Sequence, residues 1–394
     1  APAPAPAAPA AAAGATPPKP AARYSITSRS ADCFARVEQI GEGQYGQVWL
    51  ARDITPNSTE RGALVALKKV KMDNEKEGFP ITAMREIKIL KNLRHDNIVR
   101  LKEVVTSKAG EANKQKGSVF MVFEYAEHDL EGLIRNPRVK IEKPHVKSYL
   151  KQLLEGLHYL HKQKILHRDI KGANLLITND GRLKIADFGL AKSTNDPSAK
   201  LTPVVITLWY RPPEILLESR NYSAPADLWS VGCIFAELLF KLSLNSFRTL
   251  WSLSSGQGQG PGPSTEAQQI AVIFKICGTP TSESWPKWNA LPGAKNMNYK
   301  PMDSQLASLM KEHCPGVDDA EISLLEKFLT CNPDNRITAH HALDDTFFWS
   351  DPLPAAFEDM PRITEACHEW QVKKKKMQQQ KDQTTKHHSH GGGH

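Results

Sequence analysis

Hydrophobic and polar positions follow a strand-like period over the first third of this chain. From Phe34 to Leu50 apolar and polar residues alternate around a cluster of glycines, and Leu64 to Val70 is a β-branched, apolar run with lysines at its end. The same character returns over residues 99–106 and 118–124, which are joined by a polar loop. Alternation with many β-branched residues is typical of half-buried strands. This region predicts a twisted antiparallel sheet.

Helical spacing replaces this alternation in two places. Ile81 to Leu93 carries apolar residues three or four positions apart behind Pro80, and proline is favoured at the start of a helix. Beyond Tyr125 helical periods dominate, as in residues 145–163, whose apolar side chains fall on one face. The pattern predicts an α+β protein with a small β-rich lobe containing one main helix, a larger helical lobe, and a hinge over residues 124–129. A cleft between two such lobes commonly binds a nucleotide.

One segment of the helical lobe fits neither pattern. Residues 240–263 mix Leu, Ser, Phe and Trp without a clear period and end in Gly-Gln-Gly-Gln-Gly-Pro-Gly-Pro. Such a composition predicts a low-complexity loop. We interpret the segment as an atypical insertion in the helical lobe.

Length and composition agree with a two-lobed protein that carries tails. The 394 residues exceed the usual size of a single-core domain. Hydrophobic residues make up 40% and charged residues 24%, and no apolar run approaches the ~20 residues of a membrane helix, which favours a soluble protein. The six cysteines have neither CxxC spacing nor a histidine partner. This argues against a disulfide framework or a zinc site and indicates a reducing compartment.

Both ends of the chain have a biased composition. Residues 1–33 are dominated by alanine and proline, which cannot build a packed core, so we expect a disordered tail. Residues 349–394 form a basic tail, whose run Lys373 to Lys376 contributes to the net charge of +8. Such a run is typical of a solvated tail, but also of a nuclear-import or nucleic-acid-facing patch.

The candidate chemistry lies in two neighbouring motifs of the helical lobe. His167-Arg168-Asp169-Ile170-Lys171-Gly172-Ala173-Asn174 is followed shortly by Asp187-Phe188-Gly189. They offer a general base, Asp169, and a cation beside it, Lys171, which would neutralise charge on a transferred group. Asn174 and Asp187 add oxygen ligands of the kind that magnesium prefers. Phosphoryl transfer from ATP requires this set.

Two features of the predicted sheet complete the set. The run Gly41-Glu42-Gly43-Gln44-Tyr45-Gly46 lies between two strands, and its glycines would let backbone amides approach phosphate oxygens closely. Alone, such a run is as often an ordinary hairpin turn. Lys68 on the following strand suits the α and β phosphates, and Glu86 on the intervening helix is the carboxylate that would orient it. A solvated lysine face is the plainer interpretation, but it does not explain why all these residues occur together in order.

These motifs resemble those of eukaryotic protein kinases, and more closely those of the cyclin-dependent kinases. The run Pro80-Ile81-Thr82-Ala83-Met84-Arg85-Glu86 is similar to the helix that binds cyclin in that family, and Thr207-Leu208-Trp209-Tyr210-Arg211-Pro212-Pro213-Glu214 is also typical of it. Residues 75–79, the catalytic loop with Gly172, and residues 347–352 resemble the transcription-elongation branch, especially its plant and algal C-type members. The resemblance implies the bilobal protein-kinase fold. It places the kinase domain at 34–348, with an N-lobe at 34–123, the hinge at 124–129 and a C-lobe at 130–348.

The resemblance also implies roles for individual residues. Catalytic roles are expected for Lys68, Glu86, Asp169, Lys171 and Thr207, and magnesium binding for Asn174 and Asp187. ATP is expected to contact the glycine-rich loop, the sheet above the base, the hinge and one residue below the base: Ile40, Gly41, Glu42, Gly43, Gln44, Tyr45, Gly46, Gln47, Val48, Ala66, Lys68, Phe123, Glu124, Ala126, Asp129 and Leu176.

The same resemblance implies a substrate class. Val205, Ile206 and Arg211 are expected to shape a pocket that favours proline after the phosphorylated Ser or Thr. Proline has no backbone N–H, so a pocket whose carbonyl is turned away penalises every other residue type.

Activation is expected to follow the family as well. Thr202 occupies the position of the activating phosphosite, and Arg85, Arg168 and Lys192 match the basic residues that bind its phosphate. Lys192 stands where the family usually has Arg, so we expect a looser clasp of the phosphate. Pro203 makes the activation site itself a Thr-Pro site.

The expected cofactors are ATP and Mg²⁺, and the expected partner is a T-type cyclin bound through the Pro80-to-Glu86 helix. The expected substrate is the C-terminal repeat of RNA polymerase II or another protein with Ser/Thr-Pro sites. We expect a nuclear location, with the cytoplasm left open, and neither direct nucleic-acid binding nor membrane binding.

Two other functions remain as alternatives. A pseudokinase or cyclin-binding scaffold is favoured only if residues 240–263 disrupt the helical lobe. A nucleic-acid-binding protein rests on the basic tail alone, which lacks aromatic residues interleaved with its charge.

Overall fold

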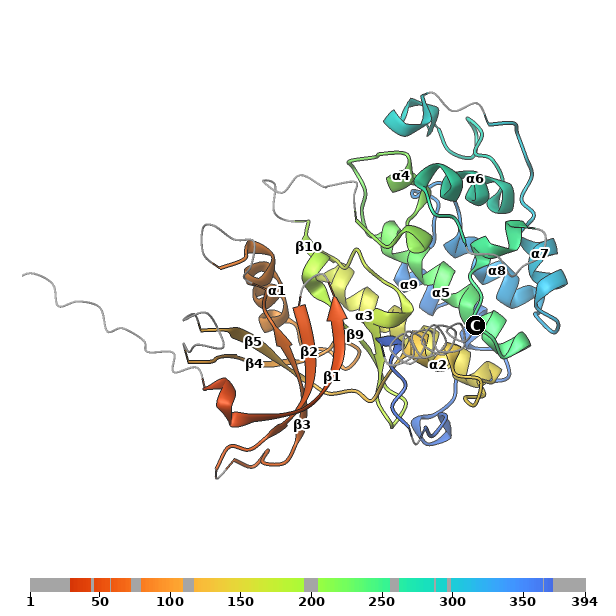
Figure 1. Ribbon diagram of the computed structural model, residues 1–394. Coiled ribbons are helices and arrows are strands. Elements are labelled where there is room, and N and C mark those ends of the chain that lie inside the picture. The colour runs from red at the N-terminus through yellow and green to blue at the C-terminus, as the bar shows by residue number, and fades with distance from the viewer. Residues whose placement is uncertain are drawn as a thin grey trace, which may run out of the picture.

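The computed structural model describes residues 29–43, 46–56, 58–71, 79–108, 117–194, 205–255, 262–286, 288–295, 299–363 and 365–370. These residues form a β-rich lobe and a helical lobe, as the sequence predicts (Figure 1). No helix in these ranges is both long and apolar enough to cross a lipid bilayer.

An antiparallel sheet of five strands in the order β1-β2-β3-β5-β4 forms the N-terminal lobe. Its strands are β1 (Phe34–Gly43), β2 (Gly46–Asp53), β3 (Leu64–Lys69), β4 (Leu101–Thr106) and β5 (Val119–Glu124). On β3, Val65 and Leu67 are buried in a core on one face of the sheet. Because side chains alternate along a strand, Ala66 and Lys68 lie on the other face. The register pairs Lys68 with Val48 and Met121, which fixes its place in the sheet.

The predicted helix of this lobe is α1 (Ile81–Asn92), which follows Pro80 and lies beside the sheet (Figure 1). Its buried side chains are Ala83, Glu86, Ile89 and Leu90. Ile81 and Met84 are 66% and 55% exposed, although both are apolar. One face of α1 therefore packs inward with Glu86, and another leaves apolar side chains uncovered.

The helical lobe is organised around two long helices, α3 (Lys143–Lys162) and α5 (Pro225–Leu244), which contact each other. Its other helices are α2 (Leu130–Arg135), α4 (Pro213–Leu216), α6 (Glu266–Cys277), α7 (Leu306–His313), α8 (Asp319–Phe328) and α9 (Ala339–Leu343). Single 3₁₀ turns are η1 (Ala31–Cys33), η3 (Gly172–Asn174), η4 (Phe188–Leu190), η5 (Leu208–Tyr210), η6 (Leu250–Ser255), η7 (Trp288–Ala290), η8 (Pro292–Ala294), η9 (Thr346–Phe348) and η10 (Phe357–Asp359).

Two small sheets in the helical lobe were not indicated by the sequence pattern. Strands β6 (His128–Asp129), β8 (Leu175–Ile177) and β9 (Leu183–Ile185) form one, and β7 (Ile165–Leu166) pairs with β10 (Lys192–Ser193) in the other. Strands of two or three residues are too short to show a period in the sequence. These ladders flank the motifs at 167–174 and 187–189, so they fix the loops that carry the candidate chemistry.

Residues 240–255 differ from the low-complexity loop that the composition predicts for 240–263. Helix α5 continues to Leu244, and Asn245 ends it in the left-handed conformation with φ 47°. Leu250, Trp251 and Leu253 are at most 4% exposed and belong to the main core. Apolar side chains in an irregular segment can be buried without periodic spacing, which is why the pattern missed them. Residues 256–261 lie outside the described part of the chain.

Candidate active site

A cavity of about 680 Å³ lies between the two lobes. The strands β1, β2 and β3 wall one side of it, and the hinge with β8 walls the other. Of the predicted nucleotide contacts, those that line it are Ile40, Gly41, Glu42, Gly46, Val48, Ala66, Lys68, Phe123, Glu124, Ala126, Asp129 and Leu176. Gly43 ends β1, and Gln47 lies outside the lining, where its amide donates to Glu42 at 3.5 Å. Gln44 and Tyr45 fall outside the described residues.

Lys68 joins the two lobes at the back of this cavity. Its Nζ atom lies 2.9 Å from Glu86 Oε1 on α1 and 2.9 Å from Asp187 Oδ1. Burial alone would lower the pKa of Lys68, but the carboxylates of Asp187 and Glu86 raise it, so the ammonium stays charged. The same ammonium outweighs burial at Asp187 and lowers the pKa of that carboxyl. The predicted Lys68–Glu86 pair is therefore formed in this conformation.

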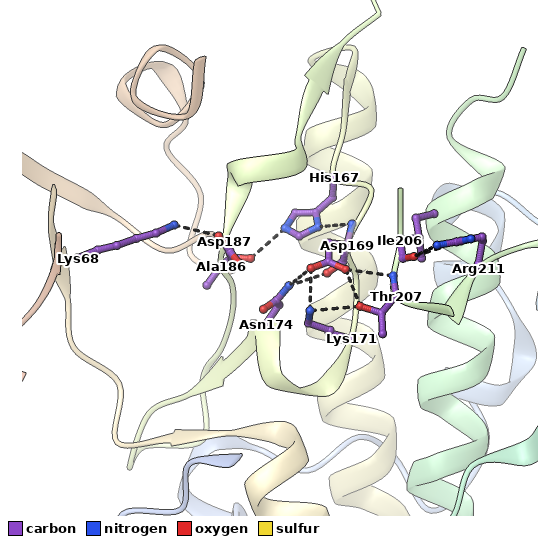
Figure 2. A network of polar contacts seen from close by, with 10 residues as sticks. All are labelled: Lys68, His167, Asp169, Lys171, Asn174, Ala186, Asp187, Ile206, Thr207 and Arg211. Atoms are coloured by element: carbon purple, nitrogen blue, oxygen red, sulfur yellow. Dashed lines mark hydrogen bonds and ion pairs between the residues drawn. The ribbon is translucent and has the colours of Figure 1, made fainter. Parts of the chain in front are cut away.

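The catalytic loop is anchored from below by Asp227 on α5. Its carboxylate accepts the backbone N–H groups of His167 at 3.0 Å and Arg168 at 2.9 Å. His167 Nε2 lies 3.0 Å from the carbonyl oxygen of Ala186, which precedes Asp187 (Figure 2). Burial lowers the pKa of the His167 imidazole, which favours the neutral ring. Through these bonds α5 sets the position of both motif loops.

Gly172 lets this loop pack closely on α2. A Cβ atom at Gly172 would lie 3.0 Å from Cβ of Glu131 and 3.1 Å from its backbone nitrogen. Any side chain there would push the catalytic loop away from the helix. The glycine therefore supports the position of η3, in which Asn174 lies.

Asp169 is the centre of the polar network in Figure 2. Its Oδ2 atom lies 2.9 Å from Lys171 Nζ and accepts a hydrogen bond from Asn174 Nδ2 at 2.9 Å. Its Oδ1 atom accepts the hydroxyl of Thr207 at 3.0 Å, and Lys171 reaches the same hydroxyl at 3.2 Å. A carboxylate held by three neighbours and facing a cavity can accept a proton from a hydroxyl placed beside it. All five predicted catalytic residues thus meet around one cavity.

Asn174 and Asp187 have the donor atoms that a magnesium ion would need. The Asn174 amide nitrogen donates to Asp169, so its oxygen is the atom turned away from Asp169. Asp187 is held by Lys68 through one carboxylate oxygen. Magnesium keeps waters and binds phosphates instead of filling an all-protein cage, so two protein ligands fit such an ion.

A loop on the substrate side of the cavity holds the predicted proline pocket. Val205, Ile206, Thr207 and Arg211 all line the cavity. Ile206 has φ 66°, a left-handed conformation that is unusual for a β-branched residue. Its carbonyl oxygen accepts two hydrogen bonds from the guanidinium of Arg211, at 3.2 and 2.9 Å (Figure 2). Arg211 also forms an ion pair with Glu266, the first residue of α6. The Ile206 carbonyl is therefore hydrogen-bonded to Arg211 of the same chain.

The basic residues predicted to bind a phosphate at Thr202 can be placed only in part, because Thr202 itself lies outside the described residues. Arg85 is exposed on α1. Arg168 donates to the Leu190 carbonyl at 2.7 Å and to the Tyr222 hydroxyl at 3.0 Å. Lys192 is buried on β10. Their convergence on a phosphate stays a prediction.

The C-terminal residues His368, Glu369 and Trp370 also line the cavity, and sequence reasoning missed them. Asp129, predicted to lie near the ribose, accepts the backbone N–H of Glu369 at 2.8 Å through Oδ2, while its Oδ1 caps α2 at Gly132. The Asp129 backbone N–H donates to the carbonyl of Cys367 at 3.0 Å. The one signal in the sequence was an aromatic residue next to a polar, lysine-rich tail.

Comparison with known proteins agrees with this geometry. The family model described as "Protein kinase domain" matches residues 34–348. Cyclin-dependent kinase C-1 of Oryza sativa subsp. japonica is 51% identical over 358 residues, which cover 88% of this chain and 64% of that protein. Cyclin-dependent kinase 9 of Homo sapiens is 43% identical over 338 residues, which cover 83% of each chain.

A solved structure gives the same result. The crystal structure of the yeast RNA Pol II CTD kinase CTDK-1 complex contains a chain that matches with a TM-score of 0.69 and 38% identity, covering 84% of this chain and 97% of that one. This chain spans only 64% and 65% of the two rice C-type relatives. The chain therefore belongs to the protein kinase family and, within it, to the cyclin-dependent kinases, on the branch that holds the C-type kinases and cyclin-dependent kinase 9.

Proposed function

We propose that this chain is a cyclin-dependent Ser/Thr kinase that transfers the γ-phosphate of ATP to Ser/Thr-Pro sites. The observation that carries the proposal is the arrangement around Asp169. That carboxylate contacts Lys171, Asn174 and Thr207, and it shares one cavity with Lys68, Glu86 and Asp187. A scaffold has no physical need for this complete and ordered set.

Each group then has a chemical role. Bound ATP would supply the phosphoryl group, and the magnesium ion would offset its negative charge. Lys68, oriented by Glu86, binds the α and β phosphates, while Asn174 and Asp187 hold the metal. Asp169 positions the incoming hydroxyl and accepts its proton, and Lys171 offsets the negative charge that develops beside it. Such preorganised charges act most strongly in a cavity that excludes water.

The proposed substrate class rests on the Ile206 carbonyl. Since this carbonyl is engaged by Arg211, the N–H of a residue after the phosphorylated Ser or Thr finds no acceptor there. Proline has no N–H and escapes the penalty. The C-terminal repeat of RNA polymerase II is the substrate we propose. The likeness to a chain of the yeast RNA Pol II CTD kinase complex supports this choice.

The proposed partner is a T-type cyclin that covers α1. Ile81 and Met84 leave apolar surface exposed on this helix, beside the buried Glu86. A partner that packs on them would hold α1 and keep Glu86 against Lys68. We propose the nucleus as the place of action, because a polymerase substrate is found there.

Activation is proposed to occur by phosphorylation of Thr202, with Arg85, Arg168 and Lys192 receiving the phosphate. Because Pro203 follows, a second copy of the active enzyme can serve as the activating kinase. Incubating an Asp169→Asn chain with active enzyme and ATP tests this. Phosphate at Thr202 of the inactive chain is the expected result, and its absence there rules out activation by a second copy.

Only one of the two alternatives can be weighed against the described residues. The scaffold hypothesis required residues 240–263 to disrupt the helical lobe, yet α5 and α6 are both formed and packed in the core. The nucleic-acid hypothesis rests on Lys373 to Lys376, which lie outside the described residues.

The decisive experiment is a kinase assay on the complex. The chain is co-expressed with a T-type cyclin, and transfer of phosphate from Mg-ATP to a Ser-Pro heptad peptide is measured, with the Asp169→Asn complex as control. Transfer by the wild-type complex alone is expected. Equal transfer by both complexes, or none by wild type with Thr202 phosphorylated, would defeat the proposal.

A further inference from the structure

The first described part of the irregular segment after α5 packs into the core of the helical lobe. Its 3₁₀ turn η6 buries Leu250 and Trp251, each 1% exposed. The indole of Trp251 stacks on that of Trp229 with ring centroids 5.9 Å apart and an angle of 4° between the planes. Trp229 in turn lies under the guanidinium of Arg336, which is paired with Glu214 at 2.9 Å. Trp251 therefore rests on an aromatic and ionic cluster with little room to move.

From this position Trp251 contacts the loop on the substrate side of the cavity. Its Nε1 atom donates a hydrogen bond to the backbone carbonyl of Trp209 at 2.5 Å. Trp209 lies in η5 (Leu208–Tyr210), directly between Thr207 and Arg211. The bond thus joins a residue outside the usual kinase motifs to the middle of the predicted substrate loop.

The far end of the same segment holds the Trp209 side chain. The indole Nε1 of Trp209 donates to the carbonyl of Pro263 at 2.8 Å. Gly262 comes so close that a Cβ atom there would lie 3.1 Å from this nitrogen. Both described ends of the segment therefore hold Trp209, one through its backbone and the other through its side chain.

The position of Trp209 bears directly on the Ile206 carbonyl. Arg211, two residues after Trp209, donates to that carbonyl and pairs with Glu266 on α6. Tyr210 between them has its carbonyl fixed by Ser230 Oγ at 2.8 Å. A loop fixed at residues 209, 210 and 211 keeps the Arg211 guanidinium on the Ile206 carbonyl. If the anchor at 209 is lost, that carbonyl can turn toward the substrate.

We propose that Trp251 is a positioning residue for proline selectivity. By holding the Trp209 carbonyl, it keeps the Ile206 carbonyl on Arg211 and away from the substrate backbone. This inference rests on the proposed Ser/Thr-Pro kinase function. It gives η6 a part in choosing substrates.

The test is the Trp251→Phe variant in the complex with cyclin, phosphorylated on Thr202. Phenylalanine keeps an aromatic ring for stacking on Trp229, while it removes the N–H donor together with the rest of the indole. The measured quantity is the ratio of kcat/KM for a Ser-Pro heptad peptide to kcat/KM for the same peptide with Ser-Ala. One neutral hydrogen bond contributes modestly, so we expect this ratio to fall about fivefold.

Trp349→Phe is the matched control. Trp349 also donates its indole N–H to a backbone carbonyl, that of Leu343 at 3.2 Å, but it does not line the cavity. Its selectivity ratio should equal that of wild type. Trp209→Phe removes the bond to Pro263 at a partly exposed position, so it provides a second variant if Trp251→Phe folds poorly, and its ratio should also fall.

The outcomes distinguish failure of this inference from failure of the proposed function. A wild-type complex with no preference for Ser-Pro overturns the proposed specificity and this inference with it. A selective wild type together with unchanged ratios in Trp251→Phe and Trp209→Phe overturns the inference alone. A lower Tm without a change in selectivity would show that Trp251 is only structural.

Discussion

The two sides of the cavity are held by different kinds of interaction. On the nucleotide side, Lys68, Glu86 and Asp187 form ion pairs between charged side chains. On the substrate side, backbone carbonyls are fixed by buried donors, as Ile206 is by Arg211 and Trp209 by Trp251. Charged groups have to sit where phosphates bind, because they act on the ligand directly. A selectivity loop has to present or hide backbone atoms, so its control comes from whatever packs behind it.

The stability contributed by the two sides of the cavity also changes with pH in opposite directions. The pKa of the Asp187 carboxyl is lowered, because Lys68 outweighs the effect of burial. The stability that ionised Asp187 contributes is present when the pH is above the ordinary pKa of an aspartate. It is lost as the pH falls through the lowered pKa of the folded protein. On the substrate side, burial raises the pKa of Glu237 to about 8. The stability that protonated Glu237 contributes is fully present when the pH is below the ordinary pKa of a glutamate. It is lost as the pH rises through the raised pKa of about 8.

The largest expected effect comes from the residue that serves both sides. Asp169→Asn keeps the shape of the side chain but removes the proton acceptor, so we expect kcat to fall about 10³-fold. Steady-state kinetics with a Ser-Pro peptide measure it, and Tm should change little. Asp344→Asn on the exposed surface is the control. If kcat falls by less than about tenfold, Asp169 is not the general base.

Next comes a change confined to the nucleotide side. Lys68→Met removes the ammonium between Glu86 and Asp187, and we expect kcat/KM for ATP to fall about 10²-fold. The Ser-Pro to Ser-Ala ratio should stay at the wild-type value, because the substrate loop is untouched. Lys69→Met is a neighbouring control on the same strand. A large change of the ratio in Lys68→Met would contradict the separation of the two sides.

The complementary change is confined to the substrate side. In Arg211→Lys the two-pronged guanidinium is replaced by a point charge, which cannot make both bonds to the Ile206 carbonyl. We expect the Ser-Pro to Ser-Ala ratio to fall about tenfold, as for the loss of a charge-assisted hydrogen bond, while KM for ATP stays constant. Arg182→Lys, which is paired with Asp180 on the surface, should leave both quantities unchanged. An unaltered ratio in Arg211→Lys would show that the bonds from Arg211 to the Ile206 carbonyl do not control proline selectivity.

The smallest expected effect concerns the pH response. Glu237 is buried and accepts the hydroxyl of Tyr210 in η5 at 2.9 Å. Glu237→Gln keeps an acceptor there but removes the titrating group. Tm is measured for both proteins between pH 6 and pH 9. As the pH rises, the Tm of the variant should increase relative to that of wild type. At pH 9 we expect a difference of about 2–4 °C, for a change of ~1 kcal/mol in the free energy of unfolding. Parallel Tm curves would show that the pKa of Glu237 is not raised in the folded protein.

The sequence predicted the nucleotide side of the cavity better than the substrate side. Lys68, Glu86, Asp169, Asn174 and Asp187 were found because their residue types and spacing follow from the chemistry of phosphates and metals. The two lobes followed from the change of hydrophobic period. These are local properties of the chain, and the structure places each of these residues in the cavity.

The contribution of remote segments was not predictable. Trp251 reaches Trp209 only because α5 and η6 bring it back to the substrate loop, and no local pattern reports such a contact. Residues 368–370 join the cavity by pairing with Asp129, which lies about 240 positions earlier in the chain. Long-range packing decides both cases, and it becomes visible only in three dimensions.

The contact of residues 367–370 with Asp129 has a consequence for the order in which the protein is made. A ribosome releases the chain from its N-terminal side, and domains fold as their residues emerge. The strands, the catalytic loop and α5 are therefore available well before His368 to Trp370. During that interval the cavity lacks three of its lining residues, His368, Glu369 and Trp370. The complete nucleotide cavity first exists when synthesis has passed residue 370.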